Sequence, residues 1–120
     1  MKVFLNVDVD FRKSAWAVCA VFFINDPSNN TKDLPNFNIE KDDSSFEGVN
    51  PKVEKSFFVD SNTRELKFNI IGVNEDSIFQ KHENINFSQC FDLTKGNHIK
   101  VFLNFTKDGG MEAKSQIDWE

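Results

Sequence analysis

The segment AWAVCAVFFI, residues 15–24, is the only run of ten consecutive apolar residues in the chain. A strand that is apolar on both faces must be covered on both, so this run predicts a strand in the middle of the core. One face then packs on an opposite sheet, and the other is covered by another part of the chain or by a partner. The small residues Ala15, Ala17 and Cys19 alternate on one face, where we expect close backbone packing.

Alternating apolar and polar residues, the signature of half-buried strands, flank this run throughout the chain. The alternating segments are residues 2–11, 53–60, 65–73, 85–91, 98–105 and 111–119, with a short strand expected near residues 37–40. Short polar breaks predict hairpins between 2–11 and 15–24, between 53–60 and 65–73, and between 98–105 and 111–119. Residues 74–84 read as a loop or one helical turn.

These segments predict an all-β fold: a single antiparallel β-sandwich, or a small barrel, of about seven to eight strands. A chain of 120 residues is expected to form one domain, residues 1–120. Residues 25–52 contain all three prolines of the chain and many Asn, Asp and Ser residues. This composition predicts a long irregular loop, and long loops in compact domains often carry function.

The formal net charge of −5 is spread evenly along the chain. Residues 1–60 hold seven basic and ten acidic side chains, and residues 61–120 hold seven and nine. Binding to a phosphate backbone requires clustered Lys and Arg, so nucleic acid is not an expected partner. A membrane-surface role is excluded on the same ground, and ten apolar residues are too few to span a bilayer.

The two cysteines, Cys19 and Cys90, do not form a disulfide framework. We expect two reduced thiols in the core, with a single bridge between them as the alternative. Asp8 and Asp10 lie where a signal peptide would be basic or apolar, and no small-residue cleavage pattern follows Ile24. These features favour a cytoplasmic protein.

The pentapeptide KVFLN occurs twice, at residues 2–6 and 100–104. In both copies the phenylalanine, Phe4 or Phe102, falls on the polar face of its strand. Two exposed aromatic residues on one sheet face would form a patch for a partner or for a second copy in a homodimer. The alternative is that loops of the same chain cover them. Asp8 and Asp10 lie on the same strand face as Phe4 and suit a basic partner.

Four loop carboxylates, Asp26, Asp33, Asp42 and Asp43, are the other candidate site residues. Calcium binds six to eight oxygens and often uses acidic loops between strands. None of these residues follows the EF-hand spacing, so solvated loop acids are the simpler interpretation. No metal or other cofactor is therefore predicted.

The chain has no recognisable catalytic motif: neither histidine has a metal-ligand partner at the required spacing, and no serine lies in a nucleophile elbow. We therefore expect a protein that is not an enzyme. The favoured function is a protein-binding module, such as an acidic inhibitor or immunity-type protein that docks on a basic partner through Phe4, Phe102, Asp8 and Asp10. The alternative is a β-sandwich that binds a small ligand, calcium or a carbohydrate through residues 25–52.

Overall fold

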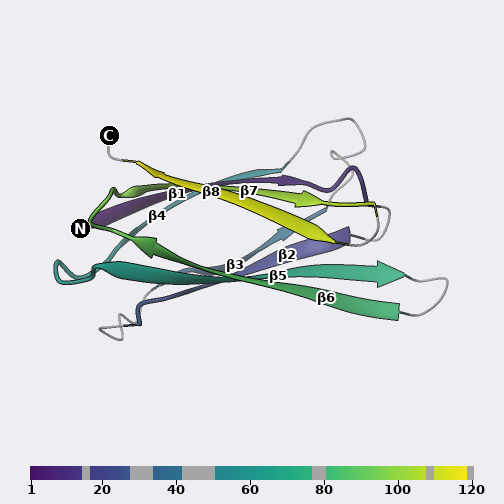
Figure 1. Ribbon diagram of the computed structural model, residues 1–120, viewed down its shortest axis with the longest axis horizontal. Coiled ribbons are helices and arrows are strands. Elements are labelled where there is room, and N and C mark those ends of the chain that lie inside the picture. Colours follow the sequence, from purple (N-terminus) through teal and green to yellow (C-terminus); the bar gives the residue numbers. More distant parts are fainter. Residues whose placement is uncertain (15–16, 28–33, 42–50, 77–80, 108–109, 119–120) are drawn as a thin grey trace.

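The computed structural model describes residues 1–14, 17–27, 34–41, 51–76, 81–107 and 110–118, and these residues form a two-layered β-sandwich (Figure 1). Eight strands lie in two sheets. The first sheet has the order β4-β1-β7-β8, from Lys52–Phe58, Lys2–Asp10, His98–Phe105 and Met111–Asp118. The second has the order β3-β2-β5-β6, from Asn36–Glu40, Ala17–Asn25, Glu65–Asp76 and Lys81–Asp92. The predicted all-β sandwich is confirmed.

One strand pair departs from the predicted antiparallel arrangement. β1 and β7 are parallel neighbours in the middle of the first sheet, and Leu5 lies opposite Ile99. These are the two strands that carry the repeated KVFLN sequence, staggered by four residues, so that Asn6 of one copy lies beside Lys100 of the other. Both strands bury one face completely, and a parallel neighbour satisfies that requirement as well as an antiparallel one.

Two of the three predicted hairpins are wrong. β1 and β2 belong to different sheets, and so do β4 and β5, so each polar break carries the chain across the sandwich. In the first crossing the backbone N–H of Ser14 donates to the carbonyl of Phe11 at 3.3 Å. In the second, Thr63 N–H donates to the Asp60 carbonyl at 2.9 Å. A polar break ends a strand, but it does not determine which sheet receives the next one.

The predicted hairpin of β7 and β8 is confirmed, with Phe105 opposite Met111 at its closed end. A second hairpin lies where a loop or helical turn was expected, because β5 continues to Asp76 and β6 begins at Lys81. The predicted long loop is also interrupted: β3 pairs with β2 over residues 36–40. Residues 28–33 and 42–50 lie outside the described part of the chain.

β2 is a central strand, as predicted, with β3 on one side and β5 on the other. Its faces are assigned differently from the prediction, because a β-bulge shifts the register between Ala17 and Cys19. Ala17, Ala20 and the residues that alternate with Ala20 face the core, whereas Cys19 lies on the outer face. A bulge adds one residue to one strand and so exchanges the two faces beyond it.

The core lies between the sheets and is closed by large aromatic side chains. Phe11 and Phe105 stack with their ring centroids 5.1 Å apart, and both are fully buried. Gly72 lies beneath Phe105: a Cβ atom at this position would be 2.9 Å from the Phe105 ring. Ala20, the residue opposite Gly72 on β2, is also fully buried. Small residues on β2 and β5 therefore make room for the aromatic rings. The sequence pattern predicts that Trp16 and Trp119 cap this core, and both residues lie outside the described part of the chain.

None of the described segments forms a helix with the length and apolar character needed to cross a membrane.

Candidate functional site

The outer face of the first sheet, called the charged face below, brings together all four residues predicted to bind a partner. Even-numbered residues of β1 point outward, because the odd-numbered residues from Val3 to Val9 are buried. The strand registers then place the outward residues of the other strands beside them. The charged face comprises Lys2, Phe4, Asn6, Asp8 and Asp10 of β1; Lys52, Glu54, Ser56 and Phe58 of β4; His98, Lys100, Phe102 and Asn104 of β7; and Glu112, Lys114, Gln116 and Asp118 of β8.

An aromatic cluster occupies one end of the charged face. Phe4 and His98 stack almost parallel, with ring centroids 4.6 Å apart and an interplanar angle of 9°. The Lys2 amino group lies 5.2 Å from the Phe4 ring centroid and 5.8 Å from that of Phe58. Phe58 is 70% exposed, more than any other large apolar residue described. A cation held between two aromatic rings stabilises their positions on the surface.

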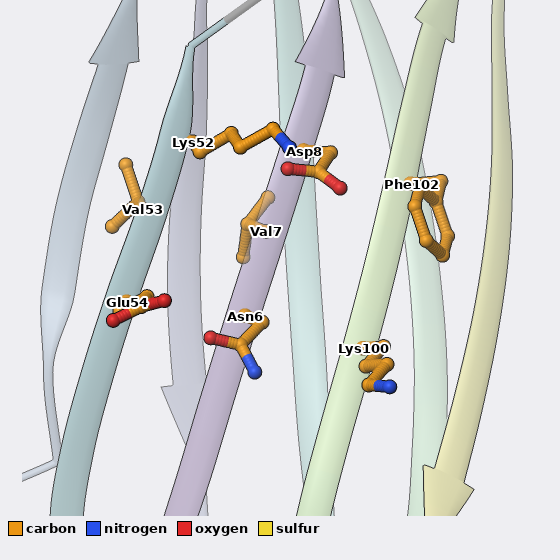
Figure 2. Close-up of a pocket in the computed structure, with 8 residues that line it drawn as sticks. All are labelled: Asn6, Val7, Asp8, Lys52, Val53, Glu54, Lys100 and Phe102. Carbon is orange, nitrogen blue, oxygen red and sulfur yellow. The ribbon is translucent and has the colours of Figure 1, made fainter.

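The second cluster is centred on Phe102, which is 47% exposed. The register forms a row across the sheet in which Lys52, Asp8, Phe102 and Lys114 are successive neighbours. Figure 2 shows the Lys52 side chain extending from β4 toward Asp8 on β1. The aromatic ring thus lies between an acidic and a basic neighbour, on a surface that is otherwise polar.

Shallow hollows run along the charged face between these clusters. One has a volume of about 250 Å³ and is lined by residues of β1, β4 and β7, among them Asn6, Asp8, Lys100 and Phe102 (Figure 2). A second hollow continues toward Phe4 and His98, and a third toward Asp10 and Asn104. These hollows are large enough to receive single side chains, and none of the three is a deep cavity.

Asp10 differs from the other predicted residues because its carboxylate already forms an ion pair with Arg12. Both oxygens of the Asp10 carboxylate accept from the Arg12 guanidinium, at 3.2 Å from Nε and 3.1 Å from Nη2. The backbone N–H of Arg12 also donates to Asp10 at 2.9 Å. The Arg12 side-chain hydrogen bonds lower the pKa of Asp10, against the opposing effect of partial burial. The carboxylate therefore stabilises the turn after β1, and it is less free to meet a partner than Asp8.

Of the four predicted loop carboxylates, the structure describes only Asp26. Asp26 is buried, and its Oδ2 accepts from the Thr63 hydroxyl at 2.8 Å, which ties the end of β2 to the β4–β5 crossing. Asp33, Asp42 and Asp43 lie outside the described residues. Among the residues described, no three His, Cys, Asp or Glu side chains gather as a metal site would require.

Three members of the aromatic cluster were not identified from the sequence: Lys2, Phe58 and His98. A signal for Phe58 existed, because the pair Phe57–Phe58 must place one ring inward and one outward on a strand. Phe57 is buried and Phe58 is exposed. The stacking of Phe4 on His98 depends on the parallel pairing of β1 and β7, which no local pattern encodes.

The outer face of the second sheet, called the neutral face below, has a different composition. Its centre is uncharged, with Cys19, Val21 and Phe23 on β2, Asn69, Ile71 and Val73 on β5, and Asn36, Asn38, Asn84, Asn86, Ser88 and Cys90 on the edge strands. The charged residues of this face lie at its margins: Glu40, Glu65, Lys67, Glu75 and Asp92. Both thiols are free and lie on this face, so the prediction that they are core residues is wrong. Burial, followed by the Glu40 charge, raises the pKa of the Cys19 thiol. A hydrogen bond with Glu65 is the main cause that raises the pKa of Cys90.

Comparisons with known proteins give no family for this chain. The sequence matches no protein-family model, and no curated protein matches it. Among solved structures, the cytotoxin suilysin from Streptococcus suis is similar with a TM-score of 0.46 and 14% sequence identity. The similarity covers 99% of this chain and 24% of the cytotoxin, so this chain spans about a quarter of that structure. A likeness at this level carries no functional conclusion.

Proposed function

We propose that this chain is a non-catalytic module that binds another protein through its charged face. The observation that supports the proposal is the exposure of Phe58 and Phe102 on a sheet face whose other side chains are mostly charged or polar. Binding energy at protein interfaces is concentrated in a few aromatic and basic residues surrounded by a polar rim. The charged face has this composition, with aromatic rings separated by hollows that a partner's side chains would fill.

The charges of the face favour a partner that is itself of mixed charge at the contact. The face carries Lys2, Lys52, Lys100 and Lys114 against Asp8, Asp10, Glu54, Glu112 and Asp118, which is four basic residues against five acidic ones. The local charge is therefore nearly balanced, whereas the whole chain carries −5. The net negative charge of the whole chain would attract a basic partner over a long range. The alternating charges beside Phe102 would then orient the partner on the charged face.

An inhibitor or immunity-type protein is the biological role that we propose for such a surface. A protein of this kind acts by covering the surface of a basic toxin or enzyme, which requires a rigid face and no chemistry of its own. β1 and β7, which carry the centre of the face, are the two interior strands of the first sheet. The free state of Cys19 and Cys90 supports action in the cytoplasm, where thiols are kept reduced.

Site-specific photo-crosslinking in the host cell tests this proposal, with Phe102 and Phe23 as a matched pair. A benzophenone side chain replaces either Phe102 on the charged face or Phe23, which is 38% exposed on the neutral face. We expect one discrete protein adduct from position 102 and none from position 23. The adduct should weaken about tenfold or more when Phe58→Ala is added, because Phe58 is the second proposed anchor.

The proposal fails if positions 102 and 23 give the same adducts, or if Phe58→Ala leaves the adduct from position 102 unchanged. Once the crosslinked protein is known, its association rate with the purified chain should fall steeply as salt is raised, as electrostatic attraction requires. An association rate independent of salt would remove the basic partner from the proposal and leave the aromatic anchors.

A further inference from the structure

The second sheet ends in an unusually long edge strand. β6 spans twelve residues, Lys81–Asp92, and is the last strand in the order β3-β2-β5-β6. In an antiparallel ladder, alternate residues direct their backbone N–H and C=O groups away from the neighbouring strand. β6 therefore presents a row of backbone donors and acceptors on the side away from β5. Such an edge is a template for pairing with another strand.

The other three edges of the sandwich carry features that oppose strand pairing. β3 has only five residues and follows Pro35. β4 follows Pro51 and contains Lys55, which points between the sheets and places its amino group 5.5 Å from the Phe37 ring centroid. β8 carries charged residues at Glu112 and Lys114. Short strands, prolines and charges, inward-pointing ones included, are the features by which sheet proteins avoid pairing edge to edge.

β6 lacks these features over most of its length. Residues 84–91, with the sequence NINFSQCF, contain no charged residue, no proline and no glycine. Ile85 and Phe87 face inward but are only half-buried, because they lie at the rim of the sandwich. Asn84, Asn86 and Ser88 are exposed on the neutral face. The edge is therefore uncharged on both faces, and its inward side chains gain burial if another strand is added.

We propose that β6 pairs antiparallel with β6 of a second copy of this chain, about a two-fold axis through Phe87. The two second sheets then form one continuous sheet across the dimer. In this register Asn86 lies opposite Ser88 of the second copy, and Asn84 lies opposite Cys90. The two Phe87 side chains meet at the axis and cover each other.

A second copy suits this edge because the uncharged stretch is self-complementary. With the axis at Phe87, the acidic positions 83 and 92 fall opposite positions 91 and 82 of the second copy, so no two acids face each other. Identical strands place like charges in opposition wherever a charged residue lies at the axis, and here the central positions are Asn, Phe and Ser. An isologous contact of this kind closes as a dimer and does not propagate.

This interface is independent of the proposed partner-binding surface. β6 belongs to the second sheet, whereas the charged face is the outer face of the first sheet. The dimer would leave both copies of the charged face exposed. Failure of the dimer would therefore not affect the proposed binding function, and failure of partner binding would not affect the dimer.

Sedimentation of the purified full-length chain over roughly a hundredfold range of concentration tests the proposal. Asn86→Lys is the disrupting variant, because it places a lysine of each copy next to the two-fold axis. Asn38→Lys is the matched control: Asn38, Val21, Ile71 and Asn86 form one row across the sheet, with the two exposed asparagines at its opposite edges. We expect a dimer for the wild type and Asn38→Lys, and dissociation about tenfold or more easier for Asn86→Lys.

A disulfide trap tests the register by a route that does not require a weakened variant. Asn84→Cys, combined with Cys19→Ser, should give a dimer under mild oxidation whose linkage joins position 84 of one copy to Cys90 of the other. A wild type that stays monomeric throughout the concentration range would overturn the proposal. So would a dimer that Asn86→Lys and Asn38→Lys weaken equally, or one that Asn86→Lys leaves intact. Binding of an added extended peptide to a monomeric chain would assign the edge to a different occupant.

Discussion

The two outer faces of the sandwich cover the same core but differ in the kind of side chain at their centres. On the charged face, the central strands β1 and β7 carry Asp8 and Lys100 beside the isolated ring of Phe102. On the neutral face, the central strands β2 and β5 carry Val21 opposite Ile71, and most of the asparagines lie on the edge strands. At the centres of the two faces, apolar residues are therefore separated on the charged face and contiguous on the neutral face.

The difference shows that exposed apolar residues have different physical roles on the two faces. Val21 and Ile71 are half-buried by each other and by their neighbours, as expected for β-branched cross-strand pairs that stabilise a sheet. Phe58 and Phe102 are more exposed and lie among charged and polar side chains. They gain little from the sheet and are available to another molecule. The neutral face thus contributes to stability and the charged face to the proposed binding.

The largest effect is expected from Gly72→Ala, beneath the neutral face. The new Cβ atom would lie 2.8 Å from the Met111 sulfur and 2.9 Å from the Phe105 ring, and real Cβ atoms do not approach so closely. Overpacking a core of this kind lowers the free energy of unfolding by about 1–3 kcal/mol. Urea denaturation measures the change.

Phe105→Leu provides the control for this prediction, because it shortens the side chain that Gly72→Ala would meet. Phe105→Leu alone should destabilise the protein, but Gly72→Ala should cost less when added to it than when added to the wild type. Such non-additivity is the signature of residues in contact. Additive effects would mean that Phe105 is not what limits the space above Gly72.

A medium effect on stability is expected from Ile71→Ala, and a smaller one from Phe102→Ala. Ile71→Ala removes the partner of Val21 between two interior strands and should lower the free energy of unfolding by about 1 kcal/mol. Phe102→Ala removes a side chain that is 47% exposed and should lower it by about 0.5 kcal/mol or less. Thermal denaturation of both variants, at the same protein concentration, measures the difference.

This pair directly tests the contrast between the faces. If Phe102→Ala destabilised the protein more than Ile71→Ala, Phe102 would be a structural residue, and its exposure would no longer favour binding. Val21→Ala is the matched control for Ile71, since both residues belong to the same cross-strand pair. The two single substitutions should have similar effects, and the double variant should lose less than their sum.

The sequence predicts the faces of most strands well, because alternation depends only on which side of a strand is buried. The odd-numbered residues of β1 and of β7 face the core, as their patterns predict. The placement of Phe4, Phe102, Asp8 and Asp10 on one outer face follows from the same alternation and from the pairing of β1 with β7. The alternation can be read from the local sequence, whereas the pairing of β1 with β7 is known only from the structure.

The sequence does not predict strand neighbours, because a strand with one buried face can pack in either sheet and beside many partners. The breaks after β1 and after β4 resemble hairpin loops in composition but lead to the opposite sheet. The bulge in β2 is a second source of error. It shifts the register by one residue at Val18, so Cys19 lies on the neutral face although simple alternation from Ala17 places it inward. Both outcomes depend on contacts distant in sequence, which local periodicity does not contain.

A similarly small effect is expected from Asp10→Asn at the end of the charged face. The Arg12 hydrogen bonds lower the pKa of Asp10 below its ordinary value of 3.8. A carboxylate with a lowered pKa in the folded state contributes stability above its unfolded pKa and loses that contribution as the pH falls through its folded pKa. Because the pair with Arg12 is partly exposed and screened by solvent, Asp10→Asn should lower the free energy of unfolding at pH 7 by about 0.5 kcal/mol.

The pH dependence separates this electrostatic contribution from a general effect of the substitution. The difference between the wild type and Asp10→Asn should be largest above about pH 4 and should vanish at lower pH, where the wild-type carboxyl is protonated as well. Asp8→Asn is the control, because it removes a carboxylate from the same face of β1 and leaves the Arg12 contact in place. If Asp10→Asn destabilised the protein equally at acid and neutral pH, the Arg12 contact would not be the source of the stability. Asp10 would then be as free as Asp8 to take part in binding on the charged face.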